Sequence, residues 1–170
     1  MSLEFHIRSE EPRDVADIWH VTKQAFAGRS YADGNEHDVI NALRDRGALA
    51  ISLVAEHKGL IVGHVAFSPA VTEDSSSGWY TLGPVAVNPD VQRQGIGKAL
   101  IRVGIATLHE LSAAGCILVG DPNYYSQFGF VQAPQNAPAR APSECFMVLS
   151  LSGQALTCRI DFHQAFYQKS

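Results

Sequence analysis

A glycine-containing stretch after an apolar run has the residue types needed to bind a phosphorylated ligand. It reads Val85-Ala86-Val87-Asn88-Pro89-Asp90-Val91-Gln92-Arg93-Gln94-Gly95-Ile96-Gly97-Lys98. The first part predicts a strand, and the second predicts a loop that enters a helix at Gly95. The first turn of a helix has unpaired N–H groups, and glycines let a ligand approach them closely. With the positive charges of Arg93 and Lys98, the stretch suits a diphosphate.

Two common nucleotide-binding motifs do not account for these glycines. A Rossmann fingerprint requires a third small residue at a fixed spacing. Here Gly97 is followed by Lys98, Ala99 and Leu100, which do not fit that spacing. A P-loop requires a glycine five residues before its Gly-Lys pair, and that position is Gln92. Close packing of the helix on the sheet is the alternative explanation of Gly95 and Gly97.

The elements that must position this stretch follow from hydrophobic periodicity and turn residues. Helical spacing predicts helices over 12–26, 39–47 and 95–114, separated by a loop at 28–34 and other turns. Runs of apolar residues predict seven strands, with a tight hairpin turn at 57–59, a polar turn at 73–78 and a proline-rich loop at 134–142. The expected strands cover residues 3–8, 49–56, 60–70, 79–87, 116–119, 145–151 and 156–162.

The order of these elements predicts an α+β fold. Residues 79–119 form a strand, a helix and a strand, which is the pattern of a right-handed βαβ crossover. The strands on either side of this unit follow one another closely and are expected to be antiparallel. We therefore expect a mixed, mostly antiparallel central sheet with helices on both faces.

Two motifs in this order resemble those of GNAT-type N-acetyltransferases. The string Gln92-Arg93-Gln94-Gly95-Ile96-Gly97 is similar to the acetyl-CoA signature of that family, which is Gln or Arg, two residues, Gly, one residue, then Gly or Ala. The string Tyr125-Ser126-Gln127-Phe128-Gly129-Phe130 resembles its Tyr-x-x-x-Gly-Phe element. The resemblance covers most of residues 3–151 and extends to a branch of uncharacterised bacterial acetyltransferases.

The resemblance implies acetyl-CoA as the cofactor and a role for each matching residue. Val85 and Val87 match the strand whose backbone pairs with the pantetheine arm, and Tyr125 matches the tyrosine that protonates the departing thiolate. The loop matches the one whose N–H groups hold the pyrophosphate. Its predicted cofactor residues are Gln92, Arg93, Gln94, Gly95, Ile96, Gly97 and Lys98. Core packing is the alternative role of the two valines and of Tyr125, whereas Tyr124 lacks the family position.

The sequence does not decide which residue would act as the general base. Acetyl transfer needs a neutral amine, and a lysine-type amine with a pKa of about 10.4 is mostly charged at neutral pH. Many members of the family have a carboxylate on the strand that matches 80–87, but this strand has none, and Pro84 favours a bulge or splay there. The candidates are Glu36, His64, Asp121 and a chain of water molecules. A helix start, a buried structural histidine and a turn are the respective alternative roles of the three residues.

The position of Asn123 differs from the family pattern. Family members often have an asparagine two helical turns before the tyrosine, whereas Asn123 stands only two residues before Tyr125. The seven histidines show no H-E-x-x-H spacing, so no metal is expected.

Acidic residues in segments 28–38 and 71–78 would favour a cationic acceptor if these segments frame the acceptor entrance. Solvated loop charge is their alternative explanation.

The length and composition limit the class of protein and the partners it could have. A chain of 170 residues that is 46% hydrophobic and 18% charged is typical of one globular domain, here 1–170. A net charge of −4 argues against a broad nucleic-acid surface, and no apolar run approaches the roughly 18 residues of a membrane span. Three cysteines without C-x-x-C spacing suit a reducing cytoplasm.

Three functional hypotheses follow. The first is an acetyl-CoA-dependent N-acetyltransferase that acts on a primary amine of a small molecule or peptide. The second is a catalytically silent CoA-binding or acyl-CoA-sensing module, and the third is an interaction domain without either ligand. Relatives in the family are often dimers, but no sequence feature here identifies an interface, so the choice between a monomer and a homodimer is open.

Overall fold

The computed structural model describes residues 3–167, which contain both strands and helices. The helices are α1 (Val15–Phe26), α2 (Glu36–Asp45), α3 (Ile96–Glu110) and α4 (Pro122–Tyr125). The strands are β1 (His6–Ser9), β2 (Ile51–His57), β3 (Leu60–Pro69), β4 (Val71–Thr72), β5 (Trp79–Val87), β6 (Gly115–Val119), β7 (Val131–Gln132), β8 (Phe146–Ser150) and β9 (Ile160–Asp161).

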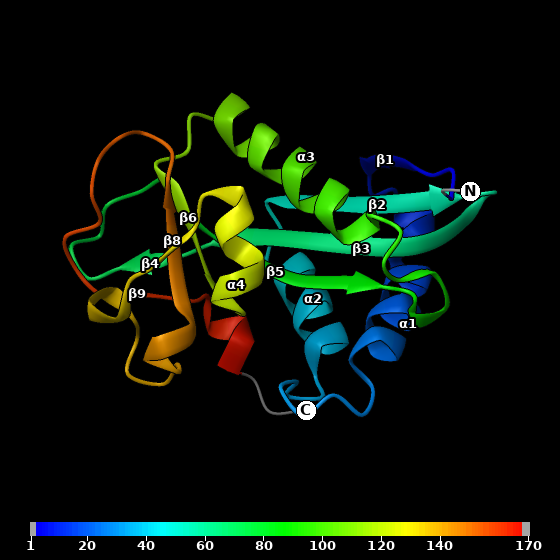
Figure 1. The fold of residues 1–170 in the computed structure, drawn as a ribbon, viewed down its shortest axis with the longest axis horizontal. Helices are drawn as coiled ribbons and strands as arrows, with labels where there is room; N and C mark the ends of the chain where they lie inside the picture. Colours follow the sequence, from blue (N-terminus) through cyan, green and yellow to red (C-terminus); the bar gives the residue numbers. More distant parts are fainter. Residues whose placement is uncertain (1–2, 168–170) are drawn as a thin grey trace.

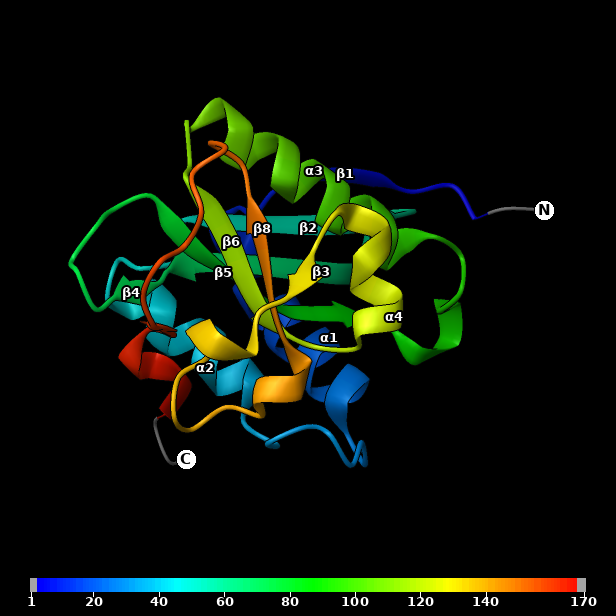
Figure 2. The same ribbon diagram turned by 60° about the vertical axis from the view of Figure 1, so that its left-hand side comes forward.

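Seven strands form one mixed sheet in the order β1-β2-β3-β5-β6-β8-β7 (Figure 1). Neighbouring strands are antiparallel except β5 and β6, which are parallel and are connected through α3. β4 and β9 form a separate two-stranded sheet. In Figures 1 and 2, β6 and β8 cross the direction of β2 and β3 at a steep angle. This angle separates the two halves of the sheet near β5.

Helices cover both faces of the sheet because side chains alternate along each strand. Val65 and Phe67 of β3 face the core that includes the buried residues of α3. Ala66, between them, faces the opposite core with Ile18 of α1. Helix α3 lies very close to β3, since a Cβ added at Gly104 would be 2.2 Å from the Phe67 ring.

The α+β fold expected from the sequence is confirmed. β2, β3 and β5 are antiparallel neighbours, and β5, α3 and β6 form the crossover. The hairpin turn between β2 and β3 has the expected geometry, with positive φ values of 50° at Lys58 and 80° at Gly59. Two successive residues with positive φ give the type of turn that matches the twist of paired strands.

The structure corrects some strand boundaries. The expected strand over 156–162 is paired only at Ile160–Asp161, where β9 joins β4 instead of extending the main sheet. β4 and β7 were not expected, because two-residue strands carry too little periodic signal to be recognised. The first strand is His6–Ser9 rather than 3–8.

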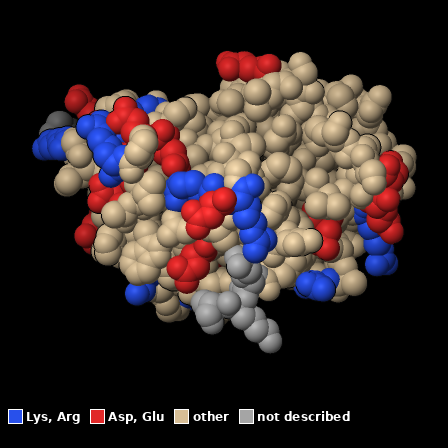
Figure 3. All heavy atoms as spheres, turned by 180° about the vertical axis from the view of Figure 1, so that it is seen from behind, with Lys and Arg blue, Asp and Glu red and all other residues tan. Residues whose placement is uncertain are grey.

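Acidic and basic side chains are interspersed on the face turned away from the viewer of Figure 1, as Figure 3 shows. Ion pairs occur among the charged residues of the chain, and Arg8 lies 2.7 Å from Asp14 and 2.9 Å from Glu56. On this face neither sign of charge forms a continuous patch. Within residues 3–167, no helix is both long and apolar enough to cross a bilayer.

Candidate active site

The carboxyl half of β5 has a backbone edge without a strand partner among the described residues. β5 pairs with β6 only from Trp79 to Thr81, opposite Gly115 to Ile117. On its other side β5 stays paired with β3 as far as Val87. The register shifts by one residue between the pairs Phe67–Leu82 and Val65–Val85, so the bulge expected around Pro84 is confirmed. From Leu82 onward, one edge of β5 is open.

Strand alternation decides which peptide groups face this open edge. The Asn88 N–H donates to the Val62 carbonyl of β3 at 2.8 Å, so the Asn88 peptide group faces β3. Because successive residues of a strand alternate, Val87 and Val85 direct their backbone N–H and C=O groups away from β3. Consistent with this direction, the side-chain amide of Gln92 donates to the Val87 carbonyl at 3.1 Å.

The loop after β5 directs backbone N–H groups toward the same end of the strand. Arg93 and Gly95 have positive φ values of 64° and 85°, and α3 begins at Ile96. The first hydrogen bond of the helix runs from the Ala99 N–H to the Gly95 carbonyl at 3.0 Å. The three N–H groups before Ala99 therefore have no acceptor within the helix. A backbone of this kind forms an anion-binding concavity.

The two glycines of this loop do not serve close packing. A Cβ added at Gly97 would meet nothing closer than 3.6 Å, and one at Gly95 would meet nothing within 4 Å. Gly95 is required for its positive φ, and Gly97 leaves space beside the free N–H groups. The residues thus fit a diphosphate, whereas helix–sheet packing is the role of Gly104 further along α3.

Tyr125 is held against the far side of the opening by a short capped helix. The Asp121 side chain accepts a hydrogen bond from the Asn123 N–H at 2.9 Å and caps α4. The Tyr125 ring packs on Gly120, where a Cβ would lie 2.5 Å from it, and on Phe130. Burial raises the pKa of Tyr125, with smaller contributions from Tyr124, Tyr31 and Cys116. No hydrogen bond of its hydroxyl to another residue in 3–167 is found.

Comparison with known proteins identifies the family. A family model described as an acetyltransferase (GNAT) domain matches residues 49–132. The uncharacterised N-acetyltransferase YhbS of Escherichia coli K12 is 32% identical over 167 residues, which cover 94% of this chain and 97% of YhbS. The chain belongs to the GNAT family of N-acetyltransferases. YjhQ of the same organism, also an uncharacterised N-acetyltransferase, is 34% identical over 163 residues, covering 90% of this chain and 87% of YjhQ.

Two solved GNAT structures are similar over nearly the whole chain. A GNAT family acetyltransferase from Brucella melitensis in complex with acetyl-CoA has a TM-score of 0.86 and 41% identity, and the match covers 96% of this chain and 98% of that one. YhbS from E. coli in complex with CoA has a TM-score of 0.89 and 29% identity, covering 100% and 96%. The GNAT-like fold expected from the sequence is therefore confirmed.

Tyr124, which lacks the family position and was given no role from the sequence, lies beside the cofactor loop. Its hydroxyl lies 3.8 Å from the position of a Cβ on Gly97, so it reaches the first turn of α3. Its side chain is 38% exposed. The Tyr-x-x-x-Gly-Phe element marks Tyr125 alone, and the path of α4 decides that Tyr124 faces the loop while Tyr125 packs inward.

Two of the three candidate bases hold turns together. The Glu36 carboxylate accepts hydrogen bonds from the N–H groups of Asp33 at 2.7 Å and Gly34 at 3.1 Å. Asp121 caps α4, as described above. Both have the structural role that the sequence offered as the alternative. The exposed Asn123 donates its N–H to that cap and is part of the same turn.

The third candidate, His64, is fully buried on the sheet face covered by α1. It lies on β3 between Val54 of β2 and Ala86 of β5, and its Nε2 is 2.8 Å from Ser52 Oγ. Its Nδ1 is buried without a hydrogen-bond partner, as are the hydroxyl oxygens of Ser68 and Thr81. Since Ala66 faces α1, the alternate residues His64 and Ser68 do as well. Buried polar atoms are nearly always paired with protein or water, so these three atoms stand out among the buried polar groups of the described residues.

The two acidic segments expected at the acceptor entrance lie in different places. Segment 71–78 is at the amino end of β5, where Glu73 bonds the Arg159 N–H at 2.7 Å and Asp74 bonds the Ser76 N–H at 3.0 Å. It is therefore remote from the loop at the carboxyl end of β5. Segment 28–38 carries Tyr31, which is 75% exposed and acts electrostatically on Tyr125. Of the two segments, only 28–38 contributes to the raised pKa of Tyr125.

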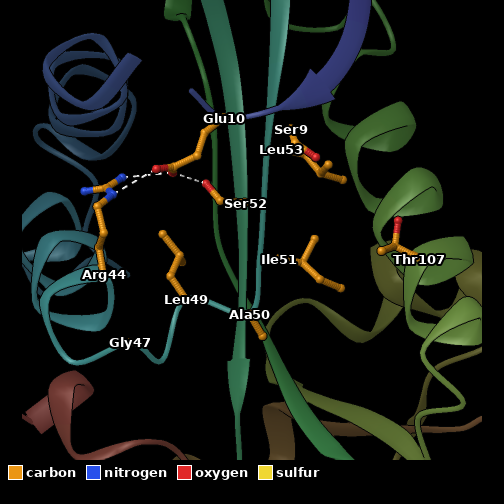
Figure 4. A pocket seen from close by; sticks show the side chains of 10 residues that line it. All are labelled: Ser9, Glu10, Arg44, Gly47, Leu49, Ala50, Ile51, Ser52, Leu53 and Thr107. Atoms are coloured by element: carbon orange, nitrogen blue, oxygen red, sulfur yellow. Dashed lines mark hydrogen bonds and ion pairs between the residues drawn. The ribbon is translucent and has the colours of Figure 1, made fainter. Parts of the chain in front are cut away.

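A cavity of about 360 Å³ lies at the beginning of β2, away from the open edge of β5 (Figure 4). Its lining includes Glu10, Arg44, Ser52 and Thr107. A smaller cavity of about 240 Å³ is lined by α1 and the loop that follows it. Among the described residues, no group of three or more His, Cys, Asp or Glu side chains is arranged to hold a metal ion.

Proposed function

We propose that this GNAT protein transfers the acetyl group of acetyl-CoA to a primary amine of a small molecule or peptide. The observation that carries the proposal is the open edge of β5 between the free N–H groups at the start of α3 and the Tyr125 ring. Similar proteins from B. melitensis and E. coli bind acetyl-CoA and CoA, which supports the same cofactor here.

The chain's own residues divide the binding work. The free N–H groups before Ala99, with Arg93 and Lys98, would hold the pyrophosphate at the helix start. The outward peptide groups of Val85 and Val87 would hydrogen-bond the pantetheine arm as an added strand would. The thioester supplies an activated acyl group when it is bound. An N–H of β5 beside it would stabilise the developing negative charge on the carbonyl oxygen.

Tyr125 acts as the general acid in this proposal. Burial keeps its phenol protonated, because its pKa is raised above the ordinary value of about 10. A thiolate is a weaker base than a phenolate, so transfer to the departing sulfur is uphill, and the raised pKa of Tyr125 adds to that cost unless burial raises the pKa of the thiol as well. Tyr125 would give its proton to that sulfur and take one back from solvent.

Thiol release from acetyl-CoA tests the proposal. The purified protein would be assayed with small amines, polyamines, aminoglycosides, amino acids and peptides, while calorimetry measures acetyl-CoA binding. Binding together with amine-dependent thiol release is the expected result. Absence of acetyl-CoA binding would overturn the proposal.

A silent CoA-binding module is the second candidate, because β5 has no carboxylate and the Glu36 and Asp121 side chains are engaged in turns. Tight CoA binding without thiol release for any amine would favour it. For the acetyltransferase, the acceptor is defined only as a primary amine, and the mixed charge on the face in Figure 3 selects neither an anionic nor a cationic one.

A further inference from the structure

A chain of hydrogen bonds connects α2 with the centre of the sheet. Arg44 donates through Nε and Nη2 to the two carboxylate oxygens of Glu10, both at 2.9 Å. The same carboxylate bonds Ser52 Oγ, as Figure 4 shows, and Ser52 Oγ in turn lies 2.8 Å from Nε2 of His64. Hydrogen bonds thus connect side chains from four separate segments of the chain.

The chemistry of the groups decides where the hydrogens lie. Burial by itself would raise the pKa of Glu10, but the hydrogen bonds of Arg44 and Ser52 outweigh it and lower that pKa, so Glu10 is ionised at neutral pH. An ionised carboxylate can only accept, and Ser52 must therefore donate its hydroxyl hydrogen to Glu10. The Ser52 oxygen then accepts from Nε2–H of His64. Neutral His64 consequently carries its only ring hydrogen on Nε2, and its Nδ1 has a free lone pair.

That free nitrogen points toward the part of the sheet that adjoins the open edge of β5. The two nitrogens of an imidazole point in nearly opposite directions, and Nε2 points at Ser52 of β2. Nδ1 therefore points away from β2, on the face where the partner of His64 across β3 and β5 is the small residue Ala86. His64 is 0% exposed, and Nδ1 has no partner in 3–167. A buried lone pair of this kind needs a donor, and no described residue provides one.

Resting on the proposed acetyl transfer, we propose that Nδ1 of His64 receives, through one bound water, the proton that the acceptor amine loses. Ser52 and Glu10 are positioning residues that keep this nitrogen unprotonated. In the reaction a C–N bond forms and a C–S bond breaks. The amine nitrogen loses one proton toward His64 and the sulfur gains one from Tyr125. Exchange with solvent afterwards removes the proton from His64 and returns one to Tyr125.

The electrostatics agree with a base that is neutral before each turnover. Burial lowers the pKa of His64 to about 4, Glu10 opposes this shift, and Arg44 adds to it. These are the charged groups within residues 3–167 that act on the ring. Burial makes the imidazolium costly, and the Glu10 carboxylate stabilises it through Ser52 while the negative charge of the departing thiolate develops nearby. For a weakly basic amine, kcat/KM should thus stay level from pH 8 to pH 5.

The tautomer of His64 can be tested without turnover. In ¹⁵N-labelled protein free of ligand, the ring nitrogens should show Nε2 protonated and Nδ1 unprotonated between pH 8 and pH 5. Ser52→Ala should produce a mixture of tautomers, and Ser52→Thr should restore the single form, since residue 52 lines the cavity of Figure 4 and has room for a methyl group. A wild-type protein with hydrogen on Nδ1 would overturn the proposal.

Kinetics test the proton role. His64→Gln retains an N–H donor for Ser52 but has no titratable base, so kcat should fall about 10²-fold for strongly basic amines and much less for weakly basic ones. An equal loss for all amines, or none, would overturn the His64 role. Amine-dependent turnover with the wrong tautomer would overturn His64 alone. A correct tautomer in a protein that releases no thiol with any amine would overturn the proposed function, and the proton role with it.

Discussion

Tyr125 and Tyr124 are adjacent, yet the structure places them on different surfaces. One packs against Gly120 and Phe130, and the other reaches the first turn of α3. Tyr125→Phe retains the ring and removes only the hydroxyl. We expect turnover to fall by about 10²–10⁴-fold with little change in acetyl-CoA affinity, because general acid catalysis contributes that much.

The acidity of the leaving thiol tests whether Tyr125 protonates it. The loss should shrink for acyl donors whose leaving thiol is more acidic, since that thiolate needs a proton less. Steady-state kinetics with a series of thioesters would measure it. The same loss for every donor would instead mean that Tyr125 positions the thioester. No loss at all would direct attention to Tyr124.

Gly95 permits a test of the cofactor loop with a matched control. Gly95→Ala and Gly59→Ala both place a Cβ at a positive φ in open space, at 85° and 80°. Each should reduce the free energy of unfolding by about 1 kcal/mol, because an L-residue is strained in that region. Only Gly95→Ala should weaken CoA binding, measured by calorimetry. Equal affinities in the two variants would remove residues 92–98 from the cofactor site.

At the scale of elements, the contact between α3 and β3 determines where the first turn of α3 lies. A Cβ at Gly104 would be 2.2 Å from the Phe67 ring, so Gly104→Ala should push the helix off the sheet. We expect a loss of about 1–3 kcal/mol in the free energy of unfolding, as is typical of overpacking. Urea unfolding would measure it. The double variant Gly104→Ala with Phe67→Leu should recover part of the loss, and a failure to recover any would contradict this account of the contact.

For the whole molecule, burial of His64 predicts instability in acid. Its pKa is lowered from 6.5 to about 4 in the folded protein, so the unfolded chain binds the proton more readily. The contribution of neutral His64 is present above pH 6.5 and is lost as the pH falls toward 4. Between pH 7 and pH 5 the loss should be about 2 kcal/mol.

Urea midpoints at pH 7, 6 and 5 would measure this dependence, and His64→Gln is the control that should show a smaller decline. Asp14 does not contribute over this range, because the hydrogen bond from Arg8 holds its pKa low and its stabilising effect is lost only below about pH 4. A wild-type midpoint that does not change over this pH range would contradict a buried neutral imidazole.

Much of the fold and of the cofactor loop was readable from the sequence because both depend on local signals. Apolar spacing identified α1, α3 and the longer strands. The two positive-φ positions of the β2–β3 turn were encoded by the tight loop at 57–59, and the bulge in β5 by Pro84. The loop at 92–98 carries its chemistry in its own residues, since the free N–H groups belong to the helix start that follows it.

Other features were decided only by the tertiary structure, because they depend on partners that are distant in the sequence. Whether Glu36 and Asp121 are free carboxylates depends on the turns around them, and both are engaged. The chain of Glu10, Ser52 and His64 depends on β1 lying beside β2, at a register that no local pattern encodes, since only the β2–β3 pairing is set by a tight turn. The type of each side chain therefore indicated the chemistry available to it. The packing of separate segments decided which of these side chains are unpaired and able to react.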